Sequence, residues 1–280
     1  MRWPSPWGEG FPGWHMECSA MSEKYLGKTF DIHGGGMDLV FPHHEAEIAQ
    51  SNSCNNCNPV NYWMHNNMIT VDGKKMGKSL GNFINLEEFF TGNHSKLDRA
   101  YSPMCIRFFI LQAHYRSTLD FSNEALQAAE KGCLKLMNAM ETVEKISASE
   151  NSTFDVNDLE QKCYAAMDDD FNTPILISHL FDGVRIINSI KDGKESLTSY
   201  DLDKLKSIFN TFVTGILGVI SWEENSGTDL TNEVMEIVLK LRGNAKNNKD
   251  FKTADLIREE LGKIGIHVKD SKEGSNWELK

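Results

Sequence analysis

The chain has 280 residues, of which 40% are hydrophobic and 25% are charged, and its net charge is −11. This composition is typical of a soluble globular protein of about two domains and excludes a mainly disordered chain. No run of about 18 apolar residues occurs, and the first residues lack the pattern of a signal peptide, which excludes a membrane-spanning helix and a secretory leader. The acidic balance argues against a protein that coats nucleic acid generally, but it allows a local basic site. Six sparse cysteines predict free thiols in a reducing cytoplasm, with one or two of them able to bind a metal.

The first third of the chain alternates between strand, glycine and helix patterns. Residues 1–13 carry three prolines and three glycines, which predicts an irregular loop. The elements that follow are a helix over Trp14–Lys24, a strand over Thr29–His33, a turn at Gly34–Gly36, a helix from Pro42, a strand over Val60–Met68 and a glycine- and lysine-rich loop at residues 71–82.

From about Leu86 the pattern changes to amphipathic helices. The expected helices are Pro103–His114, Glu124–Lys145, Asp158–Met167, Ile175–Ile190 and Asp201–Leu217. Polar linkers are expected at Ser147–Thr153 and Ser221–Thr228, and a last unit from about Asn232 has two helical runs and the strand GIHVKD. The order predicts the end of an α/β domain, then a mainly α-helical bundle, then a small α+β module.

One candidate metal site emerges from residue spacing. His43 and Glu47 are four residues apart, which on a helix places both side chains on one face. Cys18 on a separate helix would complete a set of sulfur, nitrogen and oxygen donors that suits Zn²⁺. The spacing also fits a solvated pair on a helix surface, with Cys18 as a small buried apolar residue.

Three further motifs could carry a function, but each also has an ordinary structural interpretation. The glycines at Gly34–Gly36 allow a ligand close to the backbone, but they also suit an ordinary tight turn. Lys74, Lys75 and Lys78 lie between glycines and could reach phosphate oxygens, although a solvated basic turn has the same composition. The pair Cys54 and Cys57 has no second pair and lies in a loop, so we interpret it as incidental.

The order of these motifs resembles a known family. The segments SPWGEGFPGWHMECSAM, HGGGMDLVFPHHEAEIAQS, YWMH and KMGKSLGNF, in this order, resemble bacterial cysteinyl-tRNA synthetase, a class I aminoacyl-tRNA synthetase. AMDDDFNTP at Ala166–Pro174 looks like the start of the family's helical segment, and residues 254–280 resemble its anticodon-binding module. The resemblance covers essentially the whole chain and implies a partial Rossmann-type catalytic domain at its start.

The resemblance implies a reaction and a metal. The family activates L-cysteine with ATP to cysteinyl-adenylate and transfers it to tRNA(Cys), with one zinc ion that binds the substrate thiolate. Cys18, His43 and Glu47 match three of its four protein ligands, and Trp14 and His33 match positions that line the cysteine pocket. Zinc suits this task because it prefers thiolate to hydroxyl, whereas a pocket's shape separates cysteine from serine poorly.

The resemblance also implies an ATP site, with Mg²⁺ accompanying ATP as substrate. Lys75 and Lys78 match the lysines of the family's KMSKS loop, which stabilise the charge on the departing pyrophosphate. Gly77 stands where the family usually has Ser, which affects loop mobility more than charge. By the same resemblance, Gly36 and Asp38 contact the adenosine, Asp38 through the ribose hydroxyls.

The C-terminal module is a local basic region. Nine basic and five acidic residues between Lys240 and Lys272 give it a net charge of +4 within an acidic chain, which suits RNA phosphates. By family position, the anticodon-contacting residues are Lys246, Phe251, Asp255 and Asp270, with Lys246 in place of a commoner Arg. A solvated charged helix has the same pattern.

The resemblance divides the chain into four segments. They are the C-terminal portion of the catalytic nucleotide-binding domain at 1–85, a stem-contact connector at 86–121, a helical bundle at 122–222 and an anticodon-binding module at 229–280. The family's HIGH motif and a fourth zinc-ligand cysteine are not found in the sequence, so we expect an incomplete, inactive fragment. We further expect a cytoplasmic monomer that does not bind membranes. A non-catalytic tRNA-binding fragment or paralogue, or a related cysteine ligase acting on a small amine, remains as an alternative.

Overall fold

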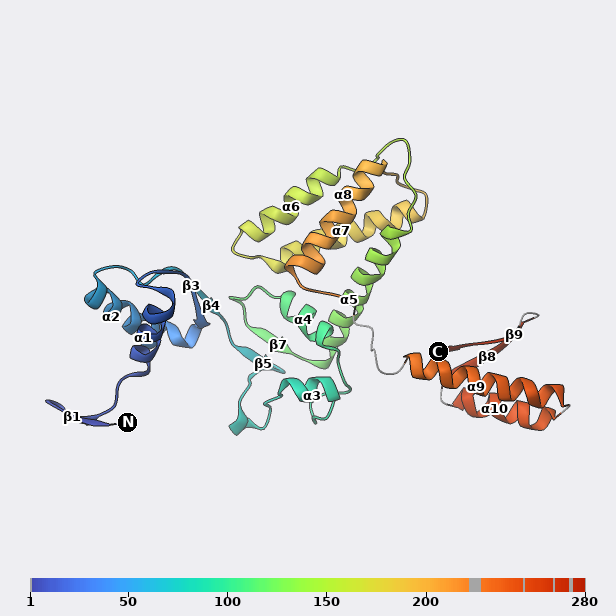
Figure 1. Ribbon diagram of the computed structural model, residues 1–280, viewed down its shortest axis with the longest axis horizontal. Coiled ribbons are helices and arrows are strands. Elements are labelled where there is room, and N and C mark those ends of the chain that lie inside the picture. Colours follow the sequence, from blue (N-terminus) through green and yellow to red (C-terminus); the bar gives the residue numbers. More distant parts are fainter. Residues whose placement is uncertain (1, 222–227, 249, 264, 272–273, 280) are drawn as a thin grey trace. The chain divides into compact units, whose positions relative to one another are not determined.

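The computed structural model describes residues 2–221, 228–248, 250–263, 265–271 and 274–279, with the side chains at 228–233, 247, 269–271, 274–276 and 278–279 left out. The contacts divide the chain into two compact units, Met1–Ser221 and Trp222–Lys280, and each is considered by itself (Figure 1). The α/β start, the helical middle and the α+β end agree with the predicted fold class. Within the described residues, no helix is both long and apolar enough to cross a membrane.

The first unit begins with a small hairpin where the sequence predicts an irregular loop. Strands β1 (Trp3–Ser5) and β2 (Gly8–Gly10) pair in antiparallel register. The Ser5 hydroxyl donates to the carbonyl oxygen of Gly8 at 2.7 Å, and Gly8 takes a φ of +112° that favours glycine. The prediction was wrong because this short pairing depends on a turn rather than on an alternating apolar pattern.

A βαβ unit follows and carries most of the predicted metal ligands. Helix α1 (Trp14–Leu26) precedes strand β3 (Phe30–Gly36), the short helical turns η1 (Met37–Leu39) and η2 (Val40–His44), helix α2 (Glu45–Asn55) and strand β4 (Val60–Asn66). Strands β3 and β4 are parallel neighbours, joined through α2.

The predicted glycine turn is part of strand β3. Gly34, Gly35 and Gly36 pair with Met64, His65 and Asn66 of β4, so the strand continues three residues beyond its expected end. None of the three glycines has a positive φ, and they take the extended backbone of the parallel ladder. The prediction failed because glycine was interpreted as a turn former, whereas here its lack of a side chain matters more than its flexibility.

The connecting region contains a three-stranded sheet. Strands β5 (Ile69–Val71), β6 (Lys74–Lys75) and β7 (Leu119–Phe121) lie in the order β6-β5-β7. The turn η3 (Lys78–Leu80) and helix α3 (Leu86–Thr91) follow β6, and Asn85 with Glu88 forms a capping box at the start of α3. Strand β7 was not predicted, because three residues give too short a pattern to separate from the surrounding helices.

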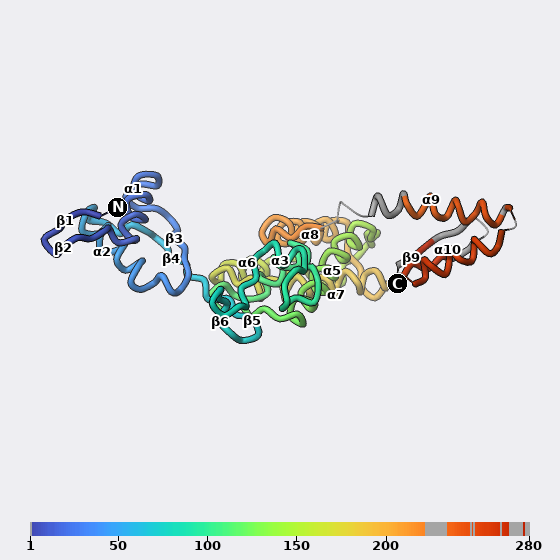
Figure 2. Tube along the Cα trace, turned by 90° about the horizontal axis from the view of Figure 1, so that it is seen from below, coloured from blue at the N-terminus to red at the C-terminus, as the bar shows by residue number. Residues whose placement is uncertain are grey.

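The helical bundle agrees closely with the predicted periodicity. Helix α4 (Pro103–Leu111) lies in the expected connector, and the bundle that follows contains α5 (Asn123–Glu144), α6 (Val156–Asp168), α7 (Thr173–Lys191) and α8 (Ser199–Phe209), with η4 (Asn210–Ile216) after them. The side chains of Ser102, Ser122, Asp155, Asn172 and Thr198 cap the starts of the five helices. Leu136 of α5, Leu180 of α7 and Leu205 of α8 are fully buried, and α5 packs against both α7 and α8. Figure 2 shows the labelled bundle helices gathered in the middle of the chain.

The second unit is a helical pair with a hairpin. Helices α9 (Thr228–Asn247) and α10 (Phe251–Lys263) precede the antiparallel strands β8 (Ile266–Ser271) and β9 (Gly274–Leu279), of which only the first was predicted. The buried Arg242 donates from Nε to the carbonyl oxygen of Ala254 at 3.3 Å, which links α9 to α10. Most of the linker predicted at Ser221–Thr228 lies outside the described residues.

Candidate metal centre and lysine loop

The three predicted metal ligands lie together in the first unit. Cys18 comes from α1, His43 from η2 and Glu47 from the first turn of α2. One ligand atom from each residue lies within 4.8 Å of the others. Ligand atoms around a tetrahedral zinc ion are about 3–4 Å apart, so small side-chain adjustments would suit this set to the metal.

The Glu47 carboxylate is the residue of the cluster whose surroundings would best suit a cation. It is only 3% exposed, and Oε1 has no hydrogen-bond partner in the described structure. His43 Nε2 approaches Oε1 to 2.9 Å, but without the angle of a hydrogen bond. A buried carboxylate oxygen without a donor is costly, and a metal ion among these residues would satisfy it.

The pKa values of Glu47 and Cys18 also suit a cation among these residues. Burial raises the pKa of Glu47 to about 7. Burial, together with the Glu47 and Glu17 carboxylates, raises the pKa of the Cys18 thiol above its usual value. Burial is the main cause of both shifts, and a bound cation would favour both ionised forms.

A layer of aromatic and imidazole rings surrounds the ligands. The Trp14 ring lies 4.3 Å from the ring of His43, measured between centroids, and His33 Nε2 lies 3.7 Å from Glu47 Oε2. The two residues predicted to line the cysteine pocket, Trp14 and His33, therefore lie next to the predicted metal ligands.

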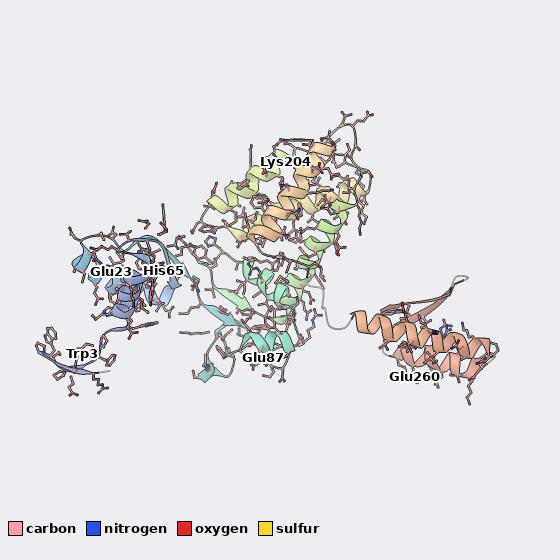
Figure 3. The ribbon with its side chains drawn as sticks, in the orientation of Figure 1. Trp3, Glu23, His65, Glu87, Lys204 and Glu260 are labelled. Atoms are coloured by element: carbon pink, nitrogen blue, oxygen red, sulfur yellow. The ribbon has the colours of Figure 1, made fainter. Side chains whose placement is uncertain are left out.

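Two histidines of this layer were missed by the sequence analysis. His44 Nδ1 lies 2.8 Å from Nε2 of His65 in a hydrogen bond, and the His44 ring also lies 4.8 Å from that of Trp63 (His65 is labelled in Figure 3). Burial lowers the pKa of His44 to about 4, so its ring is neutral at pH 7. The doubled histidine in FPHHE and the histidine in YWMH were the available signals, but spacing alone gave neither a role.

Two glycines of β3 make room for the side chains of His44 and Asp38. A methyl group at Gly35 would lie 2.7 Å from Cε1 of His44, and one at Gly36 would lie 2.3 Å from Oδ1 of Asp38. The Asp38 carboxylate thus folds back over Gly36, which brings the two predicted adenosine-contacting residues together.

The predicted phosphate-binding lysines lie on a structured turn. Lys75 ends β6, and Lys78 begins η3 with Nζ 5.4 Å from the centre of the Phe83 ring. The buried Asn82 accepts from the Gly77 amide and donates to the Lys75 carbonyl oxygen, each at 3.0 Å. Asn82, which the sequence analysis did not single out, holds the turn while both lysines stay exposed. Among the described contacts, no hydrogen bond or ion pair joins this turn to the metal-ligand cluster.

The anticodon-contacting candidates lie in the second unit. Phe251 is 61% exposed at the start of α10, and the exposed Asp255 follows one turn later on the same face. Lys246 lies in the last turn of α9. The side chain of Asp270 is outside the described region of the structure.

Substitution of Gly35 tests the packing beneath the cluster. We expect Gly35→Ala to lower the free energy of unfolding by about 1–3 kcal/mol, because the buried, hydrogen-bonded His44 cannot move away without loss. The matched control is Gly34→Ala, whose methyl group would meet only the Met64 carbonyl oxygen at an ordinary 3.6 Å. Denaturant unfolding measures both variants, and equal stabilities would contradict this packing.

Comparison with known proteins adds family relationships to this geometry. Residues 1–131 match the family described as tRNA synthetases class I (C) catalytic domain, residues 162–221 match the DALR domain, and residues 229–277 match the cysteinyl-tRNA ligase anticodon binding domain. The chain is 59% identical over 283 residues to a cysteine–tRNA ligase of Bacteroides fragilis and 58% identical over 281 residues to one of Parabacteroides distasonis. Each match covers 100% of this chain and 57% of the relative's length. The chain therefore belongs to the cysteinyl-tRNA synthetase family of class I aminoacyl-tRNA synthetases.

Proposed function

We propose that these residues serve an ATP-dependent cysteine–tRNA ligase, which forms cysteinyl-adenylate and transfers cysteine to tRNA(Cys). The observation that carries the proposal is the convergence of Cys18, His43 and Glu47, with a buried carboxylate oxygen that lacks a hydrogen-bond donor. The chain spans 57% of the length of the curated relatives it matches, so the reaction is proposed for an enzyme to which this chain contributes only a portion.

The donor set suits one Zn²⁺ ion per chain. Cys18 would hold it through sulfur, His43 through a ring nitrogen and Glu47 through oxygen, with a fourth protein ligand supplied from outside these residues. When bound, zinc favours a substrate thiolate over a hydroxyl and so supplies the selection against serine. Trp14 and His33 beside the ligands would form the walls of the cysteine pocket.

The lysine turn supplies the charge for the adenylation step. Lys75 and Lys78 are exposed and can reach the phosphates of ATP–Mg²⁺, where they would stabilise the negative charge that moves onto the leaving pyrophosphate. Asn82 keeps the turn ordered, which offsets some of the freedom that Gly77 gives it. Gly36 and the folded-back Asp38 would contact the adenosine, with Asp38 accepting from ribose hydroxyls.

The last unit is proposed to read the anticodon. Phe251 offers an exposed ring for base stacking, and Asp255 one turn later can accept from a base amino group. Lys246 and Asp270 complete the proposed set of anticodon-contacting residues.

We also propose that the chain divides into a catalytic segment at residues 1–85, a connector at 86–121, a helical bundle at 122–222 and an anticodon-binding module at 229–280.

Cobalt substitution tests the metal site. We expect the chain to bind one Co²⁺ and to show a thiolate-to-cobalt charge-transfer band, because Cys18 contributes the sulfur. Cys18→Ser is expected to abolish the band and weaken metal binding about 10-fold or more. Cys54→Ser, at an exposed cysteine near the end of α2, is the matched control and should keep both. A chain that binds no metal, or a band lost equally in both variants, would contradict the site.

Cysteine-dependent exchange of pyrophosphate into ATP tests whether the chain acts alone. We propose that it shows none, because no histidine of the sequence lies in a His-x-Gly-His context that could bind the ATP phosphates. A full-length relative serves as the positive control. Exchange at the relative's rate by this chain would overturn the proposal that it is incomplete by itself.

A further inference from the structure

The turn between α6 and α7 is joined to the segment after α4 by one acidic residue, Asp170. Its Oδ1 accepts from the Tyr115 hydroxyl at 2.7 Å, and its Oδ2 lies 2.8 Å from Nε of Arg116 in an ion pair. Its carbonyl oxygen accepts from His114 Nε2 at 3.1 Å. Asp170 thus contacts three consecutive residues of a distant segment, and these contacts are called here the Asp170 latch.

The backbone that presents this carboxylate is strained. Asp170 and Phe171 take φ values of +55° and +54°, in the left-handed region that non-glycine residues, and bulky ones above all, disfavour. The Phe171 side chain is 49% exposed, so burial of its ring does not fully offset the strain. Strained residues persist where their surroundings fix them and gather at functional positions, so we ask what the latch holds in place.

The latch holds the residue that links β4 to β5. The backbone amide of Asn67 donates to the Tyr115 carbonyl oxygen at 2.9 Å, and its side-chain Nδ2 donates to the Arg116 carbonyl oxygen, also at 2.9 Å. The two residues whose side chains contact Asp170 therefore hold Asn67 through their backbone oxygens.

From Asn67, the contacts continue to the lysine turn. Asn67 Oδ1 accepts from the amide of Met68 at 2.7 Å, and Ile69, the first residue of β5, accepts through its carbonyl oxygen from the amide of Met76 at 3.3 Å. Met76 stands between the two lysines of the turn. In the other direction along the chain, β4 carries His65 of the imidazole cluster. Asn67 therefore lies where the segment with the metal-ligand cluster joins the segment with the lysine turn.

We propose that Asp170 is a positioning residue for the lysine turn, acting through Tyr115, Arg116 and Asn67. The proposal rests on the proposed function, in which the lysines of this turn meet the phosphates of ATP. Gly77 leaves the turn free to bend, so a fixed support at its base would limit the orientations in which the lysines are presented. A carboxylate suits this task because its two oxygens hold the hydroxyl and the guanidinium at once.

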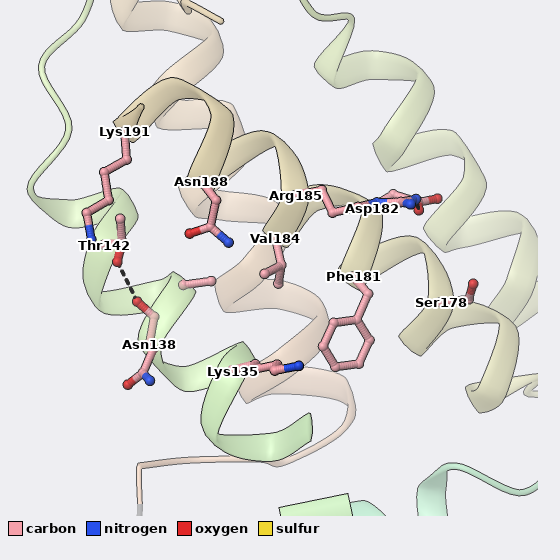
Figure 4. A pocket seen from close by; sticks show the side chains of 11 residues that line it. Lys135, Asn138, Thr142, Ser178, Phe181, Asp182, Val184, Arg185, Asn188 and Lys191 are labelled. Carbon is pink, nitrogen blue, oxygen red and sulfur yellow. Dashed lines mark hydrogen bonds and ion pairs between the residues drawn. The ribbon is translucent and has the colours of Figure 1, made fainter. Parts of the chain in front are cut away.

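Amide hydrogen exchange of the full chain tests the latch. Asp170→Asn keeps a residue that tolerates the left-handed backbone but removes the charge and one acceptor. We expect the amides of Asn67 and Met76 to exchange about threefold faster, because a partly exposed ion pair contributes modestly to local stability. The matched control is Asp182→Asn, which breaks another Asp–Arg ion pair, with Arg185 on α7 (Figure 4), and should leave both rates unchanged.

A double-variant cycle separates positioning from a general loosening of the fold. Asn67→Ala removes the side-chain bond to Arg116 and so interrupts the proposed route. If Asp170 acts through Asn67, Asp170→Asn added to Asn67→Ala should accelerate Met76 exchange much less than it does in the unmodified chain. A merely structural role of Asp170 would instead give independent effects that add. Tyr115→Phe, which removes only the hydroxyl that donates to Asp170, should also speed Met76 exchange and serves if Asp170→Asn does not fold.

The outcomes separate the latch from the proposed function. The latch proposal is overturned by unchanged exchange at Met76 in folded Asp170→Asn and Tyr115→Phe, by an equal effect of Asp182→Asn, or by additive effects in the cycle. The thiolate-to-cobalt band reports on the metal site by itself, and Asp170→Asn should keep it. Absence of that band from the unmodified chain would count against the proposed function, while the exchange rates would still decide the latch.

Discussion

The buried Glu47 carboxylate is the constraint on which the N-terminal site depends. Its Oε1 lies 2.9 Å from Nε2 of His43 without a hydrogen bond, and Cys18 adds a second acidic group to the same space. Burial with no compensating charge raises the pKa of Glu47 to about 7 and raises that of Cys18. Such an arrangement is unfavourable unless a cation completes it, so the packing of α1, η2 and α2 makes sense as a scaffold for a metal.

The surrounding elements explain how this cluster is held. The parallel pair β3 and β4 places Gly35 opposite His65, and the missing side chain at Gly35 admits the ring of His44. The hydrogen bond between His44 and His65 then links η2, which carries His43, to β4. The rings of His33, His43 and His65 all lie within 5.5 Å of the His44 ring, measured between centroids, so His43 is packed in a cluster of imidazoles.

The sequence predicted the long amphipathic helices but not the small elements, and its metal-donor set stays a prediction. Periodicity over many residues placed α5 and α7 within a few residues of their observed bounds. The hairpin of β1 and β2, the strand β7 and the strand β9 are too short or too polar for such a pattern, and tertiary pairing decides them. The roles of His44 and Asn82 likewise depend on partners distant in sequence or on burial, which spacing does not show.

The charge of the chain is unevenly distributed along the sequence. The net charge of −11 describes the whole sequence, yet residues 240–272 carry nine basic and five acidic residues, a net charge of +4. A polyanion can therefore be bound by a protein whose overall charge would repel it, provided that its contacts are confined to such surfaces.

X-ray absorption of the zinc-loaded chain, with and without cysteine, tests the central claim most directly. Without cysteine, the account predicts a zinc ion with one sulfur ligand, from Cys18, and nitrogen or oxygen in the other positions. Addition of cysteine is expected to add a second sulfur at about 2.3 Å, whereas serine should add none. A zinc environment without sulfur, or one that cysteine leaves unchanged, would contradict the claim that this cluster selects the substrate by its thiolate.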